Sequence, residues 1–474
     1  MQAPFTFDKP HVAVPSEHSS YVWGVAMVAA LGGLLFGYDW VVIGGARQFY
    51  EVYFQLTSAA LVGWANSCAL IGCLLGSLAA GYFAERFGRK KVLLISAILF
   101  AVSSIFTGWA HHFEAFIFWR IVGGAAIGLS SNVSPLYIAE ISPADIRGKL
   151  VSLNQLAIVF GILLAQIVNW KIARPIVPGM HGIAELQSWN VQTGWRWMFG
   201  AVVIPAVAFT VASIFIPESP RWLIARGRDR EACDALERIG GKQYADVEHK
   251  TVHQALQMER AGGRSGWREL LSHGIRRVLA IAIALAVLQQ WTGINTLFNY
   301  AAEVYREAGY GANDIFLNIV ITGTINVIFT LFAMMLVDRI GRRPLLLFGC
   351  IGIGVSHLLC AWAYHAHWRG GAVLMLTLSA IACYALTLAP VVWVLISEIF
   401  PNQIRSQGVS AAVSALWIAS FVLTYSFPLL NAKLGTGGTF TGYAIICLLG
   451  FVFVFFYVPE TKGRSLEQIE IDIA

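Results

Sequence analysis

The sequence predicts an all-α membrane protein with twelve transmembrane helices in two pseudo-symmetric six-helix halves. Three observations support this class: an apolar composition, twelve apolar stretches long enough to cross a bilayer, and charged motifs that occur once in each half. Of the 474 residues, 57% are hydrophobic and 13% are charged. A typical soluble domain has roughly 25% charged residues, so the composition argues strongly against a soluble protein.

The twelve apolar stretches give the order of the helices. A hydrocarbon core of about 30 Å needs roughly 20 helical residues. The stretches lie at 21–46, 59–84, 91–110, 114–139, 148–170, 195–216, 278–302, 314–337, 344–365, 371–397, 406–430 and 440–458. The polar opening lacks the features of a cleaved signal peptide, so we expect the first stretch to be retained.

Lys and Arg predict the orientation of these helices. An even number of spans places both termini on one side, and most of the 33 Lys and Arg residues fall in the segments on that side. Because cytoplasmic loops carry an excess of Lys and Arg, we expect a multi-pass protein of the cell (inner) membrane with both termini cytoplasmic. The basic charge balance thus reflects topology and gives no reason to expect nucleic-acid binding.

Three charged motifs occur once in each half. They follow spans two and eight (85–89 and 338–342), spans four and ten (140–147 and 398–405), and spans six and twelve (217–221 and 459–464). Two related six-helix units are the simplest explanation. We therefore divide the chain into a cytoplasmic segment 1–20, a half 21–216, a cytoplasmic linker of short amphipathic helices 217–277, a half 278–458 and a cytoplasmic tail 459–474.

Five hydrogen-bonding side chains gather in the seventh apolar stretch: Gln289, Gln290, Asn295, Asn299 and Tyr300. An unpaired amide in hydrocarbon costs roughly 4 to 8 kcal/mol, so this cluster should face other helices or a water-filled cavity. The amides carry no net charge, which suits a neutral polyhydroxyl ligand, and Gly293 allows a kink. We favour a lined cavity over amides that only join helices.

Seven segments together resemble the sugar porter family of the major facilitator superfamily, over nearly the whole chain. They are GYFAERFGRKK at 81–91, SPLYIAEISPADIRGKL at 134–150, PESPRWL at 217–223, QQWTGINTLFNY at 289–300, VDRIGRRP at 337–344, WVLISEIFPNQIR at 393–405 and PETKGRSLEQI at 459–469. The family includes bacterial proton-coupled sugar symporters and facilitative glucose carriers. The resemblance implies the major facilitator fold and transport of a monosaccharide.

Charged residues recur at the expected cytoplasmic ends of the helices. The set is Arg86, Arg89, Glu140, Arg147, Glu218, Arg221, Arg339, Arg342, Glu398, Arg405 and Glu460. We expect them to pair between helices when the cytoplasmic mouth is closed and to stabilise the outward-open state, a role that the resemblance also implies. The alternative is that they only anchor helix ends at the membrane interface. The excess of positive charge in cytoplasmic loops explains Lys and Arg at these positions, but it does not explain the repeated glutamates.

Two ionisable residues lie within the apolar spans of the first half, Asp39 in span one and Arg120 in span four. A buried carboxylate is favoured as the neutral acid by desolvation and as the anion by a nearby cation. If the Asp39 to Arg120 distance changes during transport, the proton affinity of Asp39 changes with it. Proton-coupled members of the resembling family use an Asp at this place. The alternative is a static buried ion pair.

The resemblance also implies further sugar-contacting residues. These are Gln166 in span five, Asn326 in span eight, Trp393 in span ten and Trp417 in span eleven, with Phe36 in span one as a weaker candidate. Aromatic faces suit the C–H faces of a pyranose. Leu416 and Asn299 depart from residues common in the family, so a hexose, a pentose or a cyclitol remains open.

We therefore expect a monosaccharide importer driven by proton symport, acting as a monomer in the lipid bilayer. A facilitative sugar or cyclitol uniporter is the main alternative, followed by a non-transporting sugar sensor and a drug/proton antiporter. No metal site, cofactor or disulfide framework is indicated, because the seven cysteines show no CxxC or Cys/His spacing. We see no nucleophile with a base and no phosphate loop, so an enzyme is not expected.

Overall fold

The computed structural model describes residues 16–176, 182–261, 270, 272–401 and 404–462, and these residues form helices and connecting turns without a strand. The first half contains α1 (Ser16–Tyr53), α2 (Ala59–Phe87), α3 (Arg89–Trp109), α4 (Phe113–Ile141), α5 (Arg147–Ile172), α6 (Ile183–Leu186), a π-helical turn (Asn190–Gly194), α7 (Trp195–Gly200) and α8 (Val203–Phe215). The second half contains α11 (His273–Trp291), α12 (Ile294–Asn299), α13 (Ala301–Glu307), α14 (Ala312–Ile340), α15 (Arg342–His365), α16 (Gly371–Leu386), α17 (Leu388–Glu398) and α18 (Arg405–Tyr457).

Among the described residues, eleven helices are long and apolar enough to cross a membrane. The last runs from Gln407 to Tyr457 and has 51 residues. At 1.5 Å per residue it is about 76 Å long, more than twice a ~30 Å hydrocarbon core. Its backbone leaves the helical region at Gly435, with φ 69° and ψ 171°. The helix therefore supplies two crossings, and the prediction of twelve spans is confirmed.

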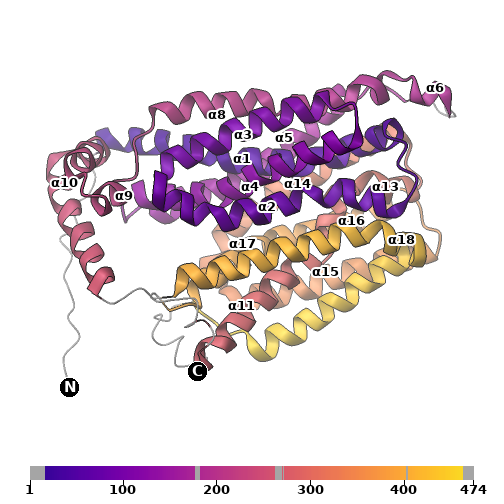
Figure 1. Ribbon diagram of the computed structural model, residues 1–474. Helices are drawn as coiled ribbons and strands as arrows, with labels where there is room; N and C mark the ends of the chain where they lie inside the picture. Colours follow the sequence, from indigo (N-terminus) through magenta and orange to yellow (C-terminus); the bar gives the residue numbers. More distant parts are fainter. Residues whose placement is uncertain (1–15, 177–181, 262–269, 271, 402–403, 463–474) are drawn as a thin grey trace.

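The two halves lie side by side in the bundle, the first indigo to magenta and the second salmon to yellow (Figure 1). Between the halves, α2 packs against α18 and α5 packs against α14. Large apolar side chains such as Ile204 and Phe215 are more than 70% exposed on the outer surface. An apolar outer surface of this kind is what a multi-pass membrane protein presents to lipid.

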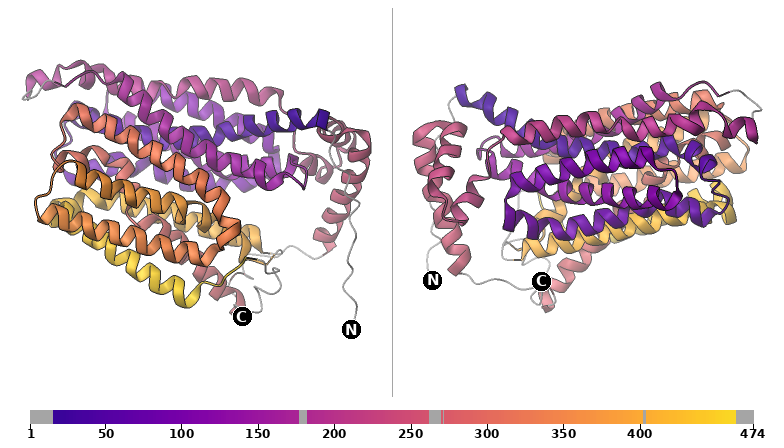
Figure 2. Two further views of the ribbon diagram at one scale, coloured as in Figure 1. Left: turned by 180° about the vertical axis from the view of Figure 1, so that it is seen from behind. Right: turned by 45° about the horizontal axis from the view of Figure 1, so that its top comes forward.

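The segment between the halves forms α9 (Pro220–Ala225) and α10 (Asp229–Ala261), which lie at one end of the bundle (Figures 1 and 2). We call this end the linker side and the opposite end, where α6 lies, the α6 side. The expected helix at 229–239 is present, but α10 is 33 residues long and is not a single straight helix, because Gly241 has φ 83°. His18 in α1 bonds to the Arg238 carbonyl at 3.1 Å and ties α10 to the first span.

Candidate substrate and proton site

Two transmembrane spans of the second half are interrupted within their apolar stretches. In the seventh span, α11 ends at Trp291 and α12 begins at Ile294, because Gly293 adopts the left-handed conformation with φ 81°. In the tenth span, α16 ends at Leu386 and α17 begins after Thr387, whose φ is −127° and ψ is −88°. Such breaks free backbone groups at membrane depth and are tolerated where protein or a cavity satisfies them.

A chain of amides connects the two breaks. Gln289 donates from Nε2 to the carbonyls of Leu388 at 3.0 Å and Ala389 at 3.2 Å. The Gln290 amide donates to Gln289 Oε1 at 3.4 Å, and Asn295 donates to Gln290 Oε1. The kink allowed by Gly293 is therefore a complete break in the helix. Gln289 and Gln290 lie on α11 and Asn295 lies on α12, so the amides do not share one continuous helical face.

Other predicted ligand residues carry buried polar atoms without a protein partner. Within the described part of the chain, no hydrogen bond is made by either amide atom of Gln166 on α5, by Oδ1 of Asn299 on α12 or by Nε1 of Trp417 on α18. Each of these side chains is at most 3% exposed. Buried polar groups in proteins normally have a hydrogen-bond partner. Unpaired polar atoms on three different helices could therefore form hydrogen bonds with a bound polar ligand.

The remaining predicted ligand residues lie on α1, α14 and α17. The rings of Phe36 on α1 and Trp417 on α18 are 5.8 Å apart and tilted at 55°, so these two residues meet across the halves. Asn326 on α14 is 4% exposed. Trp393 is half-buried on α17, the helix whose first carbonyls accept from Gln289.

Asp39 and Arg120 form a buried ion pair inside the first half. Arg120 Nη1 lies 3.0 Å from both Oδ1 and Oδ2 of Asp39, and the two side chains are 4% and 3% exposed. Arg120 Nη2 also lies 3.4 Å from the Asp39 carbonyl, and the guanidinium lies 5.2 Å from the ring centre of Phe199. Removal of either charge would leave the other buried without its partner, which is strongly unfavourable.

On the linker side of the first half, two glutamates join three helical segments. Arg89 at the start of α3 pairs with Glu140 of α4 at 2.8 Å, and Ser219 donates to Glu140 at 2.5 Å. Glu218 accepts from the backbone N–H groups of Arg89 at 2.9 Å and Lys90 at 3.1 Å. A carboxylate at this position caps the N-terminus of α3 and interacts favourably with its dipole.

The second half repeats this arrangement. Arg342 at the start of α15 pairs with Glu398 at 3.0 Å, and Thr461 donates to Glu398 at 2.6 Å. Glu460 accepts from the backbone N–H groups of Arg342 and Arg343, each at 3.0 Å. Partial burial acts to raise the pKa of Glu460, but these donors and those of the following residues outweigh it, and its pKa lies below the ordinary value.

The five other residues of the predicted charged set also lie on the linker side. Arg147 donates to the Ser142 carbonyl at 3.2 Å and Arg405 to the Phe400 carbonyl at 3.3 Å, each five residues back in the chain. Arg86 bonds to Tyr82 of its own helix at 2.5 Å, Arg339 is exposed at the end of α14, and Arg221 lies in the first turn of α9. The pairs described above thus join helices of the same half, and closure between the halves stays a prediction.

A second charged cluster, which sequence reasoning did not single out, joins the two halves on the α6 side. Arg47 near the end of α1 pairs with Glu303 of α13 at 2.8 Å and with Glu51 at 2.5 Å. Arg306 donates to Gln48 at 3.1 Å. The i to i+4 spacing of Arg47 and Glu51 is a visible sequence signal. The contact with Glu303 is not visible in the sequence, because it depends on how the halves are docked.

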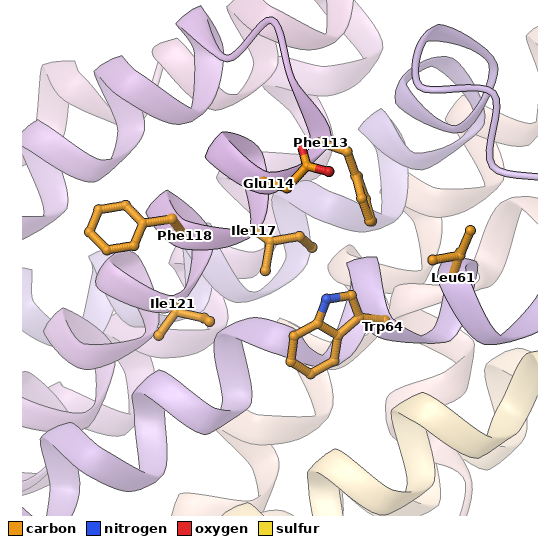
Figure 3. A pocket seen from close by; sticks show the side chains of 7 residues that line it. All are labelled: Leu61, Trp64, Phe113, Glu114, Ile117, Phe118 and Ile121. Atoms are coloured by element: carbon orange, nitrogen blue, oxygen red, sulfur yellow. The ribbon is translucent and has the colours of Figure 1, made fainter.

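One surface pocket is lined by none of these residues (Figure 3). It is formed by α2 and α4 and is lined by Leu61, Trp64, Phe113, Glu114, Ile117, Phe118 and Ile121. Phe118 is 57% exposed and Leu61 42%. The lining is mostly apolar and contains none of the buried amides, so we do not assign it to substrate binding.

The fold and site define a class of protein: a twelve-helix membrane carrier with a buried polar centre between two related halves. The model of the family described as "Sugar (and other) transporter" matches residues 25–473. The chain belongs to this sugar porter family of the major facilitator superfamily, which confirms the resemblance.

Named relatives align over nearly the whole chain. The D-xylose-proton symporter of Escherichia coli (strain K12) is 37% identical, with 96% of each chain covered. The arabinose-proton symporter of Bacillus subtilis (strain 168) is 36% identical, with 98% of this chain and 97% of that protein covered.

Solved structures of relatives have the same fold. The inward open conformation of the xylose transporter XylE from E. coli has a TM-score of 0.83 and 36% identity, with 95% of this chain and 99% of that chain covered. The proton:xylose symporter XylE bound to 6-bromo-6-deoxy-D-glucose has a TM-score of 0.79 and 36% identity, with 96% and 100% covered.

Proposed function

We propose that this protein is a secondary active transporter that imports a monosaccharide, a hexose or a pentose, by proton symport through alternating access. The relatives described above are named for D-xylose and arabinose together with a proton. The amide chain, the unpaired buried polar atoms and the ring pair of Phe36 and Trp417 supply uncharged hydrogen-bonding groups beside apolar faces. A sugar needs both kinds of surface.

The single observation that carries the proton-coupled mechanism is the buried pair of Asp39 and Arg120, with Nη1 3.0 Å from both carboxylate oxygens. A passive carrier needs no buried carboxylate at this depth, whereas a proton-coupled carrier needs a group that binds and releases a proton. A rearrangement of α1 against α4 that separates Asp39 from Arg120 during the transport cycle would favour the protonated acid, and renewed pairing would release the proton.

The remaining ligand and interface assignments are part of this proposal. Sugar contacts are assigned to Phe36, Gln166, Gln289, Gln290, Asn295, Asn299, Asn326, Trp393 and Trp417. The linker side is assigned to the cytoplasm, with both termini there and the carrier in the inner membrane, in keeping with the excess of Lys and Arg on that side. One chain contains both halves and the whole site, so we assign transport to a monomer in the bilayer, with no cofactor and no enzymatic activity.

Sugar uptake tests this function directly. Cells or proteoliposomes containing the protein should take up labelled D-xylose or a labelled hexose, and a competition panel of pentoses, hexoses and cyclitols should identify the preferred ligand. Uptake that equilibrates but never concentrates the sugar would indicate the facilitative uniporter. Binding without any uptake would indicate the sugar sensor, and a lack of binding to every sugar of the panel would reject the proposed substrate class.

A further inference from the structure

The break in the seventh span leaves the Thr292 backbone carbonyl without its helical donor. In an unbroken helix the Thr296 N–H would donate to the Thr292 carbonyl. Here it donates to the Gly293 carbonyl at 3.1 Å. The Thr292 carbonyl is instead paired with Nε2 of His357 on α15, at 2.8 Å. Thr292 and His357 are both 0% exposed, so this contact satisfies a carbonyl that water does not reach.

The contact determines which nitrogen of the imidazole carries the hydrogen. A carbonyl can only accept, so Nε2 of His357 must be the protonated nitrogen. Nδ1 is buried and has no hydrogen-bond partner among the described residues. A second ring hydrogen on Nδ1 would therefore be a buried donor without an acceptor, which is unfavourable. The geometry is consistent with a neutral imidazole in the Nε2–H form.

The neighbours of His357 hold the same break from a second helix. The imidazole lies 5.9 Å from the ring of Tyr443 on α18. The Tyr443 hydroxyl is 3.1 Å from the Thr296 hydroxyl, on the far side of the break. Its ring also fills the space beside Gly293, where an added Cβ would come within 2.4 Å of it. The left-handed turn is thus enclosed by side chains of α15 and α18.

We propose that His357 is a positioning residue for substrate binding, which acts by holding the interrupted seventh span in its broken form. Gln289 and Gln290 precede the break and Asn295 follows it, so the geometry of the break sets the relative positions of the amides. The neutral Nε2–H of His357 stabilises this geometry through the Thr292 carbonyl. The sugar-binding readout of this inference rests on the proposed function.

Two variants of His357 separate its hydrogen bond from its volume. His357→Phe keeps a planar ring but removes the donor, and His357→Gln keeps a donor. A lost hydrogen bond with a carbonyl left unsatisfied should weaken sugar binding about tenfold in the Phe variant, measured by calorimetry on purified protein. The Gln variant should recover most of this loss. Ser356→Ala is the matched control, because the Ser356 hydroxyl donates to the Gly352 carbonyl of its own helix, at 2.8 Å.

Two outcomes would overturn the inference: unchanged binding by folded His357→Phe, or an equal loss in folded Phe and Gln variants. A second measurement needs no variant and no sugar. In protein labelled with ¹⁵N-histidine, the resonance of the buried imidazole should show the neutral Nε2–H tautomer at pH 7, and an Nδ1–H tautomer or a charged ring would reject the proposal. If the wild-type protein binds no sugar, the proposed function fails, while the tautomer still tests the role of His357 at the break.

Discussion

The side-chain oxygen of Gln166 on α5 lies against Gly323 on α14, so close that a Cβ at position 323 would stand 1.8 Å from it. This contact crosses the interface between the two halves, where α5 and α14 pack together. The Gln166 amide has no hydrogen-bond partner among the described residues, so the space left by Gly323 decides where that amide lies.

Gly323→Ala should therefore weaken sugar binding by displacing the Gln166 amide, by about fivefold if one hydrogen bond to the sugar is lost. In a Gln166→Ala background the same substitution should have little further effect, because the displaced group is already absent. Calorimetry on the two single variants and the double variant measures this coupling. Gly442→Ala is the control, because Gly442 has no neighbour within 4 Å of an added Cβ. Additive losses would show that Gly323 acts on packing alone.

The amide chain and the aromatic residue of α17 give a second prediction. Gln289→Ala, Asn295→Ala and Trp393→Ala should each abolish or strongly weaken sugar binding without loss of folded protein. One hydrogen bond is worth about 0.5 to 1.5 kcal/mol, and Gln289→Ala should cost more because the carbonyls of Leu388 and Ala389 lose their donor. Asn132→Ala on α4 is the control. Near-normal sugar binding by all three variants would contradict the assignment of these residues to the sugar site.

Hydropathy and repeated motifs were enough to predict the twelve spans and the two related halves. The break at Gly293 could be suspected from the glycine, but the break at Thr387 could not, because one unusual backbone conformation does not change the hydropathy of the stretch around it. The short helices expected in the linker are present, because α9 is brief and the backbone of α10 is interrupted at Gly241.

Site residues could be predicted from the sequence where a polar or charged side chain lies within an apolar span. Asp39 and Arg120 stand out as charges in apolar spans, and the structure pairs them. His357 is also an ionisable residue in an apolar span, and this signal is visible in the sequence. The contacts of Arg47 with Glu303 and of Gln166 with Gly323 depend on the docking of distant helices, which local sequence does not contain.

The cluster on the α6 side predicts a conformational effect. Because Arg47 pairs with Glu303 across the halves at 2.8 Å, Arg47→Gln should weaken closure on this side and shift the protein toward the outward-open form. Distance measurements between spin labels on the two halves of the α6 side would detect the longer separation. Lys433→Gln, an equal loss of charge at an exposed position on the same side, should have no effect. An unchanged distance distribution in Arg47→Gln would assign this cluster to local packing.

The linker side predicts the opposite shift. Glu398 is held by Arg342 and Thr461 within the second half, and we expect the glutamates of both halves to contribute to closure of this side in the outward-open state. Glu398→Gln and Arg147→Ala should then favour inward-open forms, seen as greater cysteine accessibility on the linker side. Glu237→Gln on the exposed face of α10 is the charge control. If neither substitution changes accessibility, the charges serve only as interface anchors.

Proton coupling through Asp39 is the central claim, and Asp39→Asn tests it most directly. Asparagine resembles the protonated acid and cannot release a proton, so the variant should still bind the sugar and exchange it across the membrane. Arg120→Ala should also lose accumulation, because it removes the cation that favours the anion. In proteoliposomes with an imposed pH gradient, the wild-type protein should concentrate the labelled sugar and Asp39→Asn should only equilibrate it. Unchanged accumulation by Asp39→Asn, or no accumulation by the wild-type protein, would contradict proton symport through this residue.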